Sequence, residues 1–250
     1  MIDPKQISKD FKRFVEIRVS KFYPDYKSAL SVQVQQYVKG GIDTVTSQPL
    51  YDVLYTNYLE CGRLYGAKTI ASIQKQLRER AKRTKARMPI GFSDAIRRAI
   101  LNYLAVDLYN EAEILTDVSK EHIIEVLTKA ELEGFGIDEI VKRLTQINAI
   151  RARTIARTES VTASNLGGKL AAQESGYSDE MLKEWIGSDD GRERPTHIAN
   201  NGVKIAFKEY FNVGGFLMDH PGDRRGANGI KPDAKEVVNC RCTCAYTLPL

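Results

Sequence analysis

The sequence lacks the long apolar run of a membrane protein, has only four cysteines and contains a single tryptophan. A helix that crosses a bilayer needs about 20 consecutive apolar residues, so we expect no membrane partner. The first residues, Met1 to Lys5, also lack the charged and then apolar layout of a signal peptide. We therefore expect an intracellular protein, whose thiols stay reduced rather than forming disulfides.

Motifs of the common catalytic sites are missing as well. The chain has no Gly-x-Ser-x-Gly, P-loop, Gly-x-Gly-x-x-Gly or His-Glu-x-x-His, the patterns typical of hydrolases, nucleoside triphosphatases, dinucleotide-binding enzymes and zinc proteases. Internal repeats and low-complexity tracts are absent too, which argues against a solenoid or a disordered chain. We expect the protein not to be an enzyme.

What remains is the composition of an ordinary globular protein. Hydrophobic residues make up 42% and charged residues 28% of the 250 positions, enough for one large domain or two modest ones. The formal net charge of +5 is modest for this length but unevenly placed, because seven basic residues at positions 75–87 are opposed in that stretch only by Glu79.

The apolar spacing predicts helices almost throughout residues 5–150. Apolar residues recur at intervals of three and four, as the buried face of a helix requires. Pro24 should end or redirect the first helix because proline has no backbone N–H, and Gly40-Gly41 should end the second. Gly62 and Gly66 could kink or split the third and longest helix. Separate helices are then expected to begin after Pro49 and at Ser93, Ser119 and Asp138.

The residue pattern changes within the last hundred residues. One more helix is expected from Arg151 to about Gly176. Residues 183–186 and 237–248 read as short strands, and turn-forming Gly, Asn, Asp and Pro become frequent between them. We therefore predict an α+β protein with a mainly α-helical part at residues 1–150, built of long helices, and a small α+β module at residues 151–250.

Three cysteines and a histidine in this module form a candidate metal site. Side chains two apart in an extended strand project to the same face, so Cys240, Cys242 and Cys244 could converge on one cation. His197, in a polar loop, is the expected nitrogen ligand of a structural zinc, with His220 a less specific candidate. The alternative is that these are small, half-buried strand residues with no metal.

A set of charged residues predicts a polar cluster that pins this loop to the preceding helix. Arg157 and Glu159 lie two apart on the helix and cannot face each other, so their partners should lie elsewhere. We expect Glu159 to pair with Arg192 or Arg194, and Arg157 to reach Asp189 or Asp190. The alternative is a solvated helix face with weak ion pairs.

The basic segment is the clearest indication of a partner. One row of basic side chains falls on one helix face and a second row beside it, which leaves Ile73 and Leu77 among the residues that pack inward. Such a helix suits the phosphate backbone of double-stranded DNA without reading its bases. The alternatives are a solvated face or an acidic protein surface. The predicted contacts are Lys75, Arg78, Arg80, Lys82, Arg83, Lys85 and Arg87.

Taken in order, the motifs of the last hundred residues resemble one known family. They are Ala-Arg-Thr-Glu at 156–159, Trp185, Asp-Gly-Arg-Glu-Arg-Pro-Thr-His at 190–197, Pro-Gly-Asp at 221–223 and Asn-Cys-Arg-Cys at 239–242. This order is similar to that of the phage Mu F-like head morphogenesis proteins, over roughly residues 137–247. The sequence departs from the family pattern by its third cysteine, Cys244, and by Glu193 and Pro195 around the second basic residue of the loop.

The resemblance implies a minor head (capsid) protein of a tailed bacteriophage. Such a protein would associate with the portal protein and with the major capsid protein or scaffold of the prohead, in several copies per particle. It would take part in head morphogenesis and in the handling of packaged DNA and its ejection. Its expected location is the virion, in the head interior or at the portal vertex, after assembly in the host cytoplasm.

Two other functions stay open from the sequence. One is a metal-dependent hydrolase or nuclease built on the Cys/His module, since a metal there could activate water. The other is a nucleic-acid-binding protein unrelated to virions.

Overall fold

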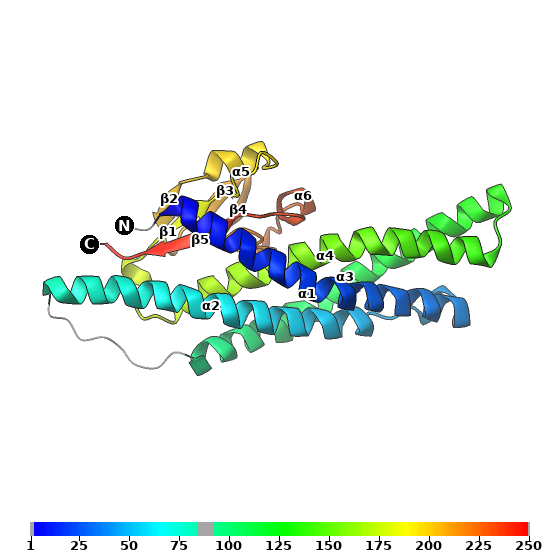
Figure 1. Cartoon of the computed structure of the whole chain (residues 1–250), viewed down its shortest axis with the longest axis horizontal. Helices are drawn as coiled ribbons and strands as arrows, with labels where there is room; N and C mark the ends of the chain where they lie inside the picture. The colour runs from blue at the N-terminus through cyan, green and yellow to red at the C-terminus, as the bar shows by residue number, and fades with distance from the viewer. Residues whose placement is uncertain (1–2, 85–92, 250) are drawn as a thin grey trace.

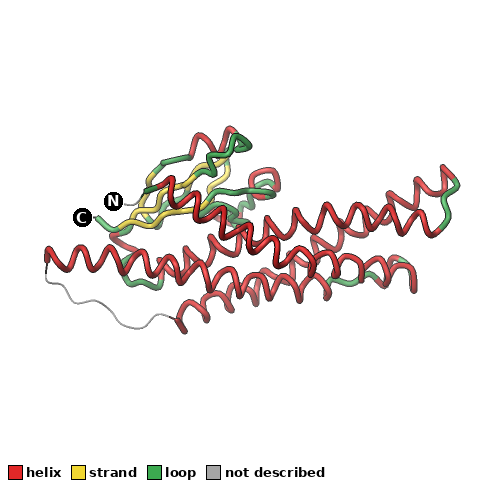
Figure 2. The backbone as a smooth tube through the Cα atoms, viewed as in Figure 1, coloured by secondary structure: helices red, strands yellow, loops and turns green. Residues whose placement is uncertain are grey.

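A computed structural model describes residues 3–84 and 93–249 of the chain. Long helices form an elongated bundle, and a small module of strands, short helices and loops packs against one end of it (Figure 1). All strands belong to this module (Figure 2). Within the described ranges, no helix is long and apolar enough to cross a membrane. The bundle consists of α1 (Pro4–Gly40), α2 (Gln48–Thr84), α3 (Ser93–Glu133) and α4 (Ile137–Gln173).

Helix α1 is continuous, so the prediction that Pro24 ends the first helix is wrong. The helix begins where Asp3 accepts a hydrogen bond from the backbone N–H of Lys5 at 3.0 Å, and it runs through Pro24 to Gly40. Pro24 is exposed, whereas Phe22, Tyr26 and Leu30 are buried on the opposite side. Packing of this apolar face outweighs the loss of one backbone hydrogen bond at the surface.

The other predicted breaks inside the helices are also wrong. Helix α2 passes through Gly62 and Gly66 without interruption, α3 passes through Ser119, and α4 passes through Arg151. The missing side chain of Gly167 on α4 allows close packing against Gly62, because a Cβ added to Gly167 would lie 2.2 Å from the carbonyl oxygen of Gly62. The backbones of α2 and α4 therefore touch where the helices cross.

The predicted division of the chain at residue 150 falls inside α4. The first half of this helix belongs to the bundle, and every residue from Thr158 to Gly168 is buried. Its second half therefore lies between the other long helices and the C-terminal module. The change from helix to mixed structure comes after Gln173.

The module is built on a three-stranded antiparallel sheet of order β2-β1-β5. Strand β1 confirms the expected strand at 183–186, and Trp185 pairs with Cys244 across β1 and β5. The expected strand at 237–248 is shorter: residues 234–237 form a helical turn, and pairing with β1 covers only Thr243–Thr247. The elements are β1 (Leu182–Ile186), α5 (Pro195–Asn200), β2 (Lys204–Ala206), β3 (Phe211–Val213), β4 (Phe216–Met218), α6 (Ala234–Val237) and β5 (Thr243–Thr247), with 3-10 turns at Ile42–Thr44, Ser178–Glu180 and Ala227–Gly229.

One apolar core joins the module to the bundle. Trp185 is fully buried and meets the ring of Phe211 edge-on at 5.3 Å. The same cluster contains Phe11 of α1 and Tyr65 of α2. A second core fills the centre of the bundle, and a third, smaller one includes Val34 and Leu144. The module is thus packed onto the helices over an apolar surface.

Candidate functional site

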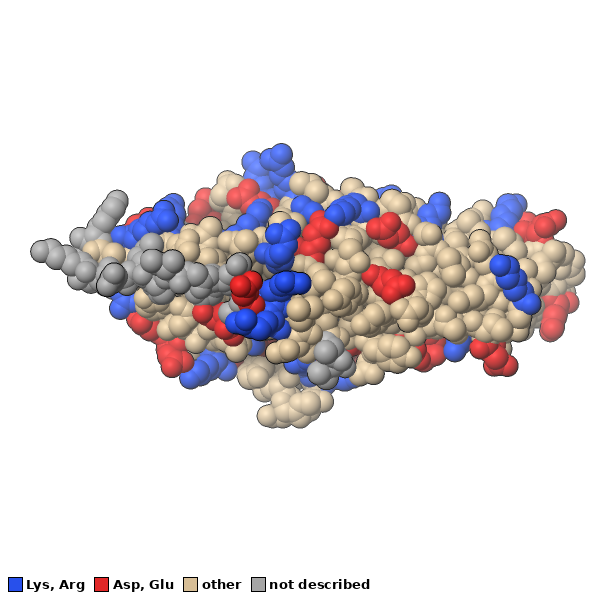
Figure 3. Space-filling model, turned by 90° about the horizontal axis from the view of Figure 1, so that it is seen from below, with Lys and Arg blue, Asp and Glu red and all other residues tan. Residues whose placement is uncertain are grey.

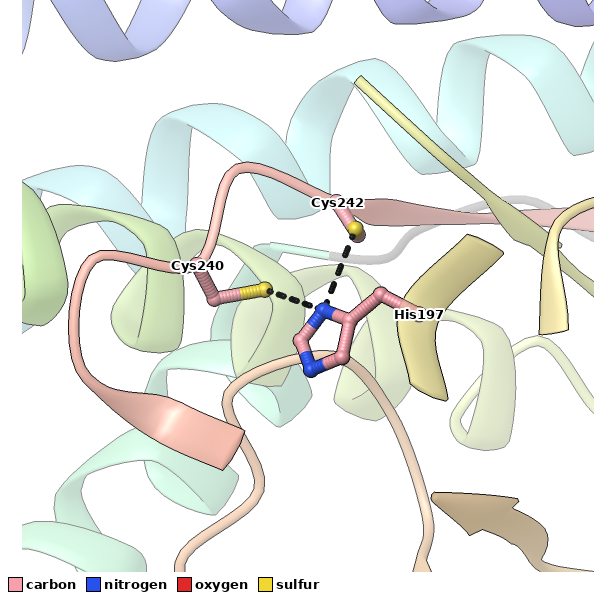
Figure 4. Close-up of side chains that lie close together, drawn as sticks. All are labelled: His197, Cys240 and Cys242. Atoms are coloured by element: carbon pink, nitrogen blue, oxygen red, sulfur yellow. Dashed lines mark hydrogen bonds between the residues drawn. The ribbon is translucent and has the colours of Figure 1, made fainter. Parts of the chain in front are cut away.

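The structure brings together three of the four predicted metal ligands. His197 lies on α5, and Cys240 and Cys242 lie on the segment between α6 and β5, with all three side chains pointing toward one another (Figure 4). The Nδ1 atom of His197 is 3.7 Å from the Sγ atom of Cys240 and 3.5 Å from that of Cys242. The three ligand atoms lie within 4.8 Å of one another, and the residues are buried.

The segment carrying the two cysteines is fixed to the neighbouring elements by its backbone. Asn239 has a φ of 57°, the left-handed conformation that asparagine tolerates better than most residues. Its N–H donates to Oγ1 of Thr158 on α4 at 3.0 Å. Beyond the turn, the amide Nδ2 of Asn165 donates to the carbonyl oxygen of Cys242 at 3.0 Å. The sulfurs are therefore placed by contacts with α4.

The other ring nitrogen of His197 faces a buried acid. Its Nε2 lies 3.3 Å from Oε2 of Glu236 on α6, which accepts a hydrogen bond from the Thr196 hydroxyl at 2.8 Å. Burial disfavours the charged ring, but Cys240 and Glu236 raise the pKa of His197 above its ordinary value. The hydrogen bond with Cys242 and that with His197 lower the pKa of the Cys240 thiol. The group therefore favours a thiolate next to the imidazole.

Cys244 is not part of this group, which corrects the prediction of three converging cysteines. Strand β5 begins at Thr243, so the alternation of a strand does not extend back to Cys240 and Cys242. Cys244 is buried, and burial raises the pKa of its thiol. His220 is also elsewhere, with Nδ1 3.1 Å from the carbonyl oxygen of Pro221. Sequence reasoning missed Glu236, which lies four residues before Cys240.

Glu159 pairs with an arginine that sequence reasoning did not identify. Its carboxylate is 1% exposed and contacts the guanidinium of Arg224, and it accepts a hydrogen bond from the Tyr58 hydroxyl at 3.0 Å. The same guanidinium lies 2.7 Å from Glu111 of α3. Burial raises the pKa of Glu159 to about 7, with Arg224 opposing this and Glu111 adding to it. These four residues, called the Arg224 cluster below, join α2, α3, α4 and the module.

The remaining members of the predicted polar cluster lie apart from Glu159. Asp190 pairs with Arg192 at 3.0 Å and with Arg241 at 2.9 Å. Arg194 donates to the carbonyl oxygen of Val238. The expected pairing of Glu159 with Arg192 or Arg194 is therefore wrong, because Arg192 pairs within the loop and Arg194 contacts the segment after α6. Arg224, from the segment after β4, links the module to α4 instead.

Arg157 does not pair with Asp189 or Asp190 as expected. Its guanidinium donates a long hydrogen bond of 3.4 Å to Oδ1 of Asn239. Burial and repulsion from Arg241, Arg192 and Arg153 lower the pKa of Arg157. The four arginines line a groove of about 910 Å³ between α1, α4 and the module. Basic side chains predominate in its lining over Glu16 and Asp190: they are Lys9, Lys12, Arg13, Arg153, Arg157, Arg192 and Arg241.

The predicted DNA-contacting residues from Lys75 to Arg83 lie at the C-terminal end of α2. Lys75 and Arg78 are exposed, and Ile73 and Leu77 are buried, as the sequence predicts. Arg80 pairs with Glu180 at 2.7 Å. Lys85 and Arg87 lie outside the described residues, as do the side chains of Lys82 and Arg83. In the space-filling view from below, acidic residues are interspersed with basic ones (Figure 3).

Comparison with known proteins identifies the family. The chain is 32% identical over 141 residues to the uncharacterized protein YqbB of Bacillus subtilis strain 168. This similarity covers 52% of the chain and 43% of YqbB, so the chain spans less than half of that relative. No solved structure matches the chain with significance. The family described as "Phage Mu protein F like protein" matches residues 121–245, half of the sequence and nearly all of the module, and the protein belongs to this family.

Proposed function

We propose that the protein is a minor head component of a tailed bacteriophage, associated with the portal and taken into the prohead. Family membership suggests a phage head protein, and this observation carries the proposal. The architecture supports a structural role, because the module is fixed to long helices by a shared apolar core. Its sites are the head interior or the portal vertex, next to the portal and the capsid or scaffold proteins.

The proposal is tested by analysing purified particles. Quantitative mass spectrometry of intact virions and of DNA-free proheads should detect this polypeptide in both, in several copies per particle. A gene deletion should give particles with defects in head assembly or in DNA delivery. Particles that lack the polypeptide and assemble and infect normally without its gene would contradict the proposal.

The surface that we assign to the portal is the tip of the hairpin formed by α3 and α4. This hairpin forms the end of the molecule opposite the module (Figure 1). Near the tip, Leu132 is 82% exposed and Ile137 is 60% exposed, although large apolar side chains favour burial. Substitution of both by Asp should abolish co-purification with the co-expressed portal protein. Ile230→Asp, at an exposed apolar position of the module, is the matched control and should leave co-purification unchanged.

We further propose that the protein contacts packaged DNA through phosphates. The support is positive charge at the end of α2 and in the groove around Arg157. If phosphates are bound, affinity for double-stranded DNA should fall steeply with salt, with a slope that decreases by roughly 0.9 for each contact removed. The pair Lys75→Gln/Arg78→Gln tests the helix, the pair Arg153→Gln/Arg157→Gln tests the groove, and Lys129→Gln on α3 is the control. DNA affinity independent of salt would refute phosphate binding.

The alternative of a metal-dependent hydrolase or nuclease has one supporting observation, the His/Cys group. Its ligand atoms are buried, which favours a structural centre, since a catalytic metal keeps a position accessible to substrate. Metal-dependent DNA cleavage by the wild type, lost in His197→Ala, would support the alternative.

A further inference from the structure

We propose that His197, Cys240 and Cys242, without Cys244, bind one structural zinc ion, with Glu236 as the outer partner that orients the histidine. This inference does not depend on the role of the protein in the phage head. It rests on the positions of the ligand atoms, their burial and the acids around them.

The distances between the ligand atoms fit a tetrahedral zinc centre. Zinc binds cysteine sulfur at about 2.3 Å and histidine nitrogen at about 2.0–2.1 Å. At the tetrahedral angle, a sulfur and a nitrogen bound to the same ion are then roughly 3.5–3.6 Å apart. The Nδ1 atom of His197 lies 3.5 Å from one sulfur and 3.7 Å from the other. The side chains could bind the ion with only small movements.

The charges also favour a divalent cation at this buried place. Two thiolates and a neutral imidazole carry a charge of about −2, which a single zinc ion cancels, and a carboxylate as fourth ligand leaves a net charge of about −1. An uncompensated thiolate would be costly to bury. The ligands must lose their protons to bind, so the uptake of zinc by two thiols releases up to about two protons to solvent. No electrons are transferred.

Glu236 occupies the position of an outer partner. A metal-binding histidine usually donates its second ring N–H to a carboxylate, which fixes the tautomer and the ring orientation. The carboxylate of Glu236 lies 3.3 Å from Nε2 and is held by Thr196. The contact does not have hydrogen-bond geometry, so the ring must turn slightly to donate to it. With the proton on Nε2, the Nδ1 atom is free to bind zinc on the side of the two sulfurs. Glu236 is 3% exposed, so it has little access to other cations.

We assign the fourth ligand to Glu193, four residues before His197. The carboxylate of Glu193 lies outside the three-residue group, so its side chain must turn to reach the ion. Its Oε1 atom is buried and has no hydrogen-bond partner, which is unfavourable for a carboxylate unless a cation lies nearby. A zinc ion would satisfy this oxygen.

The experiment uses the full chain, purified without chelators. Its zinc content is measured by elemental analysis and native mass spectrometry, and the zinc-stripped protein is titrated with Co²⁺, whose thiolate complexes absorb in the near ultraviolet. We expect about one zinc per chain and a sulfur-to-cobalt absorption in the wild type. Cys240→Ser and Cys242→Ser should each lose both signals, and Glu193→Gln should weaken them.

Cys244→Ser is the matched control, because it removes a buried thiol two residues from Cys242 that is not part of the group. It should keep zinc and the cobalt spectrum. Glu236→Gln should bind zinc about 10–100-fold more weakly than the wild type, since it removes only the outer partner.

Two results would overturn the proposal. One is wild-type protein that is purified without zinc and shows no sulfur-to-cobalt absorption. The other is a Cys244→Ser variant that loses the metal as completely as Cys240→Ser. If Cys240→Ser and Cys242→Ser fail to fold, the cobalt spectra of the wild type and of Cys244→Ser are sufficient to test the site. A spectrum with no thiolate contribution would then refute the site.

Discussion

Replacing Arg224 by Met tests whether the Arg224 cluster holds the module on the bundle. The substitution removes the cation and leaves the carboxylates of Glu159 and Glu111 facing each other, with side-chain exposures of 1% and 11%. Removal of one partner from a buried ion pair costs about 3–5 kcal/mol. Because the Arg224 side chain is 24% exposed, we expect the lower part of this range at pH 8.

The loss of stability caused by Arg224→Met should depend on pH, because it depends on whether Glu159 is charged. Burial raises the pKa of this carboxyl to about 7, and loss of Arg224, which opposes that rise, should raise it further. Below pH 7 the variant can therefore protonate Glu159 and avoid burying two uncompensated charges. The destabilisation by Arg224→Met should be largest at pH 8 and clearly smaller at pH 6.

The assay follows two probes through urea and thermal unfolding. Circular dichroism reports the long helices, and the fluorescence of Trp185, the single tryptophan, reports the module. A loss of about 3 kcal/mol should lower the Tm of a chain of this size by roughly 6–12 °C. Arg225→Met is the matched control: Arg225 pairs with Asp107 and its side chain is 50% exposed, so the effect should be at most about 1 kcal/mol.

Two outcomes would refute the reasoning. If Arg224→Met unfolds at the wild-type temperature at pH 8, the cluster does not stabilise the fold. If the loss is equal at pH 6 and pH 8, the cost does not come from the buried carboxylates.

Three further outcomes are expected. Folded Glu159 has a pKa of about 7, above the ordinary 4.5, so the folded state binds more protons between these two pH values. Wild-type stability should therefore fall as the pH rises through this window. In Glu159→Gln the urea midpoint should change less with pH over the same window. Gly167→Ala should destabilise the protein by about 1–3 kcal/mol through overpacking at the α2–α4 crossing. Gly168→Ala should be nearly neutral, because its Cβ would meet mainly the side chains of Thr69 and Tyr65. Equal Tm shifts of the two variants would contradict this. Chelation of the proposed zinc should lower the Tm followed by Trp185 fluorescence in the wild type but not in Cys240→Ser.

The sequence predicts the helical content of the bundle and several outer helix ends, such as Gly40 of α1 and Ser93 of α3, but it also predicts breaks inside helices that are continuous. The spacing of apolar residues shows a buried face on each helix, and Ile73 and Leu77 lie inward as expected. Pro24, Gly62 and Ser119 were read as breaks because each disfavours the helix interior or favours a cap when taken alone. Their helices continue because packing against neighbouring helices contributes more than these local preferences.

The sequence predicts only part of the Cys/His group, because contacts between distant segments decide which ligands meet. The spacing Cys-x-Cys and a nearby histidine indicate the ligand types. The register of β5 decides which sulfurs meet, and that register is set by pairing with β1, which begins 61 residues earlier at Leu182. The partner of Glu159 was missed because Arg224 is 65 residues away in the chain. No local pattern distinguishes it from Arg192, Arg194 or Arg225.

The second half of α4 explains why the module and the bundle form one structure. A helix buried on all sides is usually apolar, yet this one carries Thr158, Glu159 and Asn165 with exposures of 3% or less. Their polar atoms require partners, and those partners come from the module: Thr158 accepts from Asn239, Glu159 binds Arg224, and Asn165 donates to Cys242. Without the module these groups would be exposed on the helix. Without α4 the segment carrying the two cysteines would lose its anchors, so the His/Cys group and the bundle depend on the same helix.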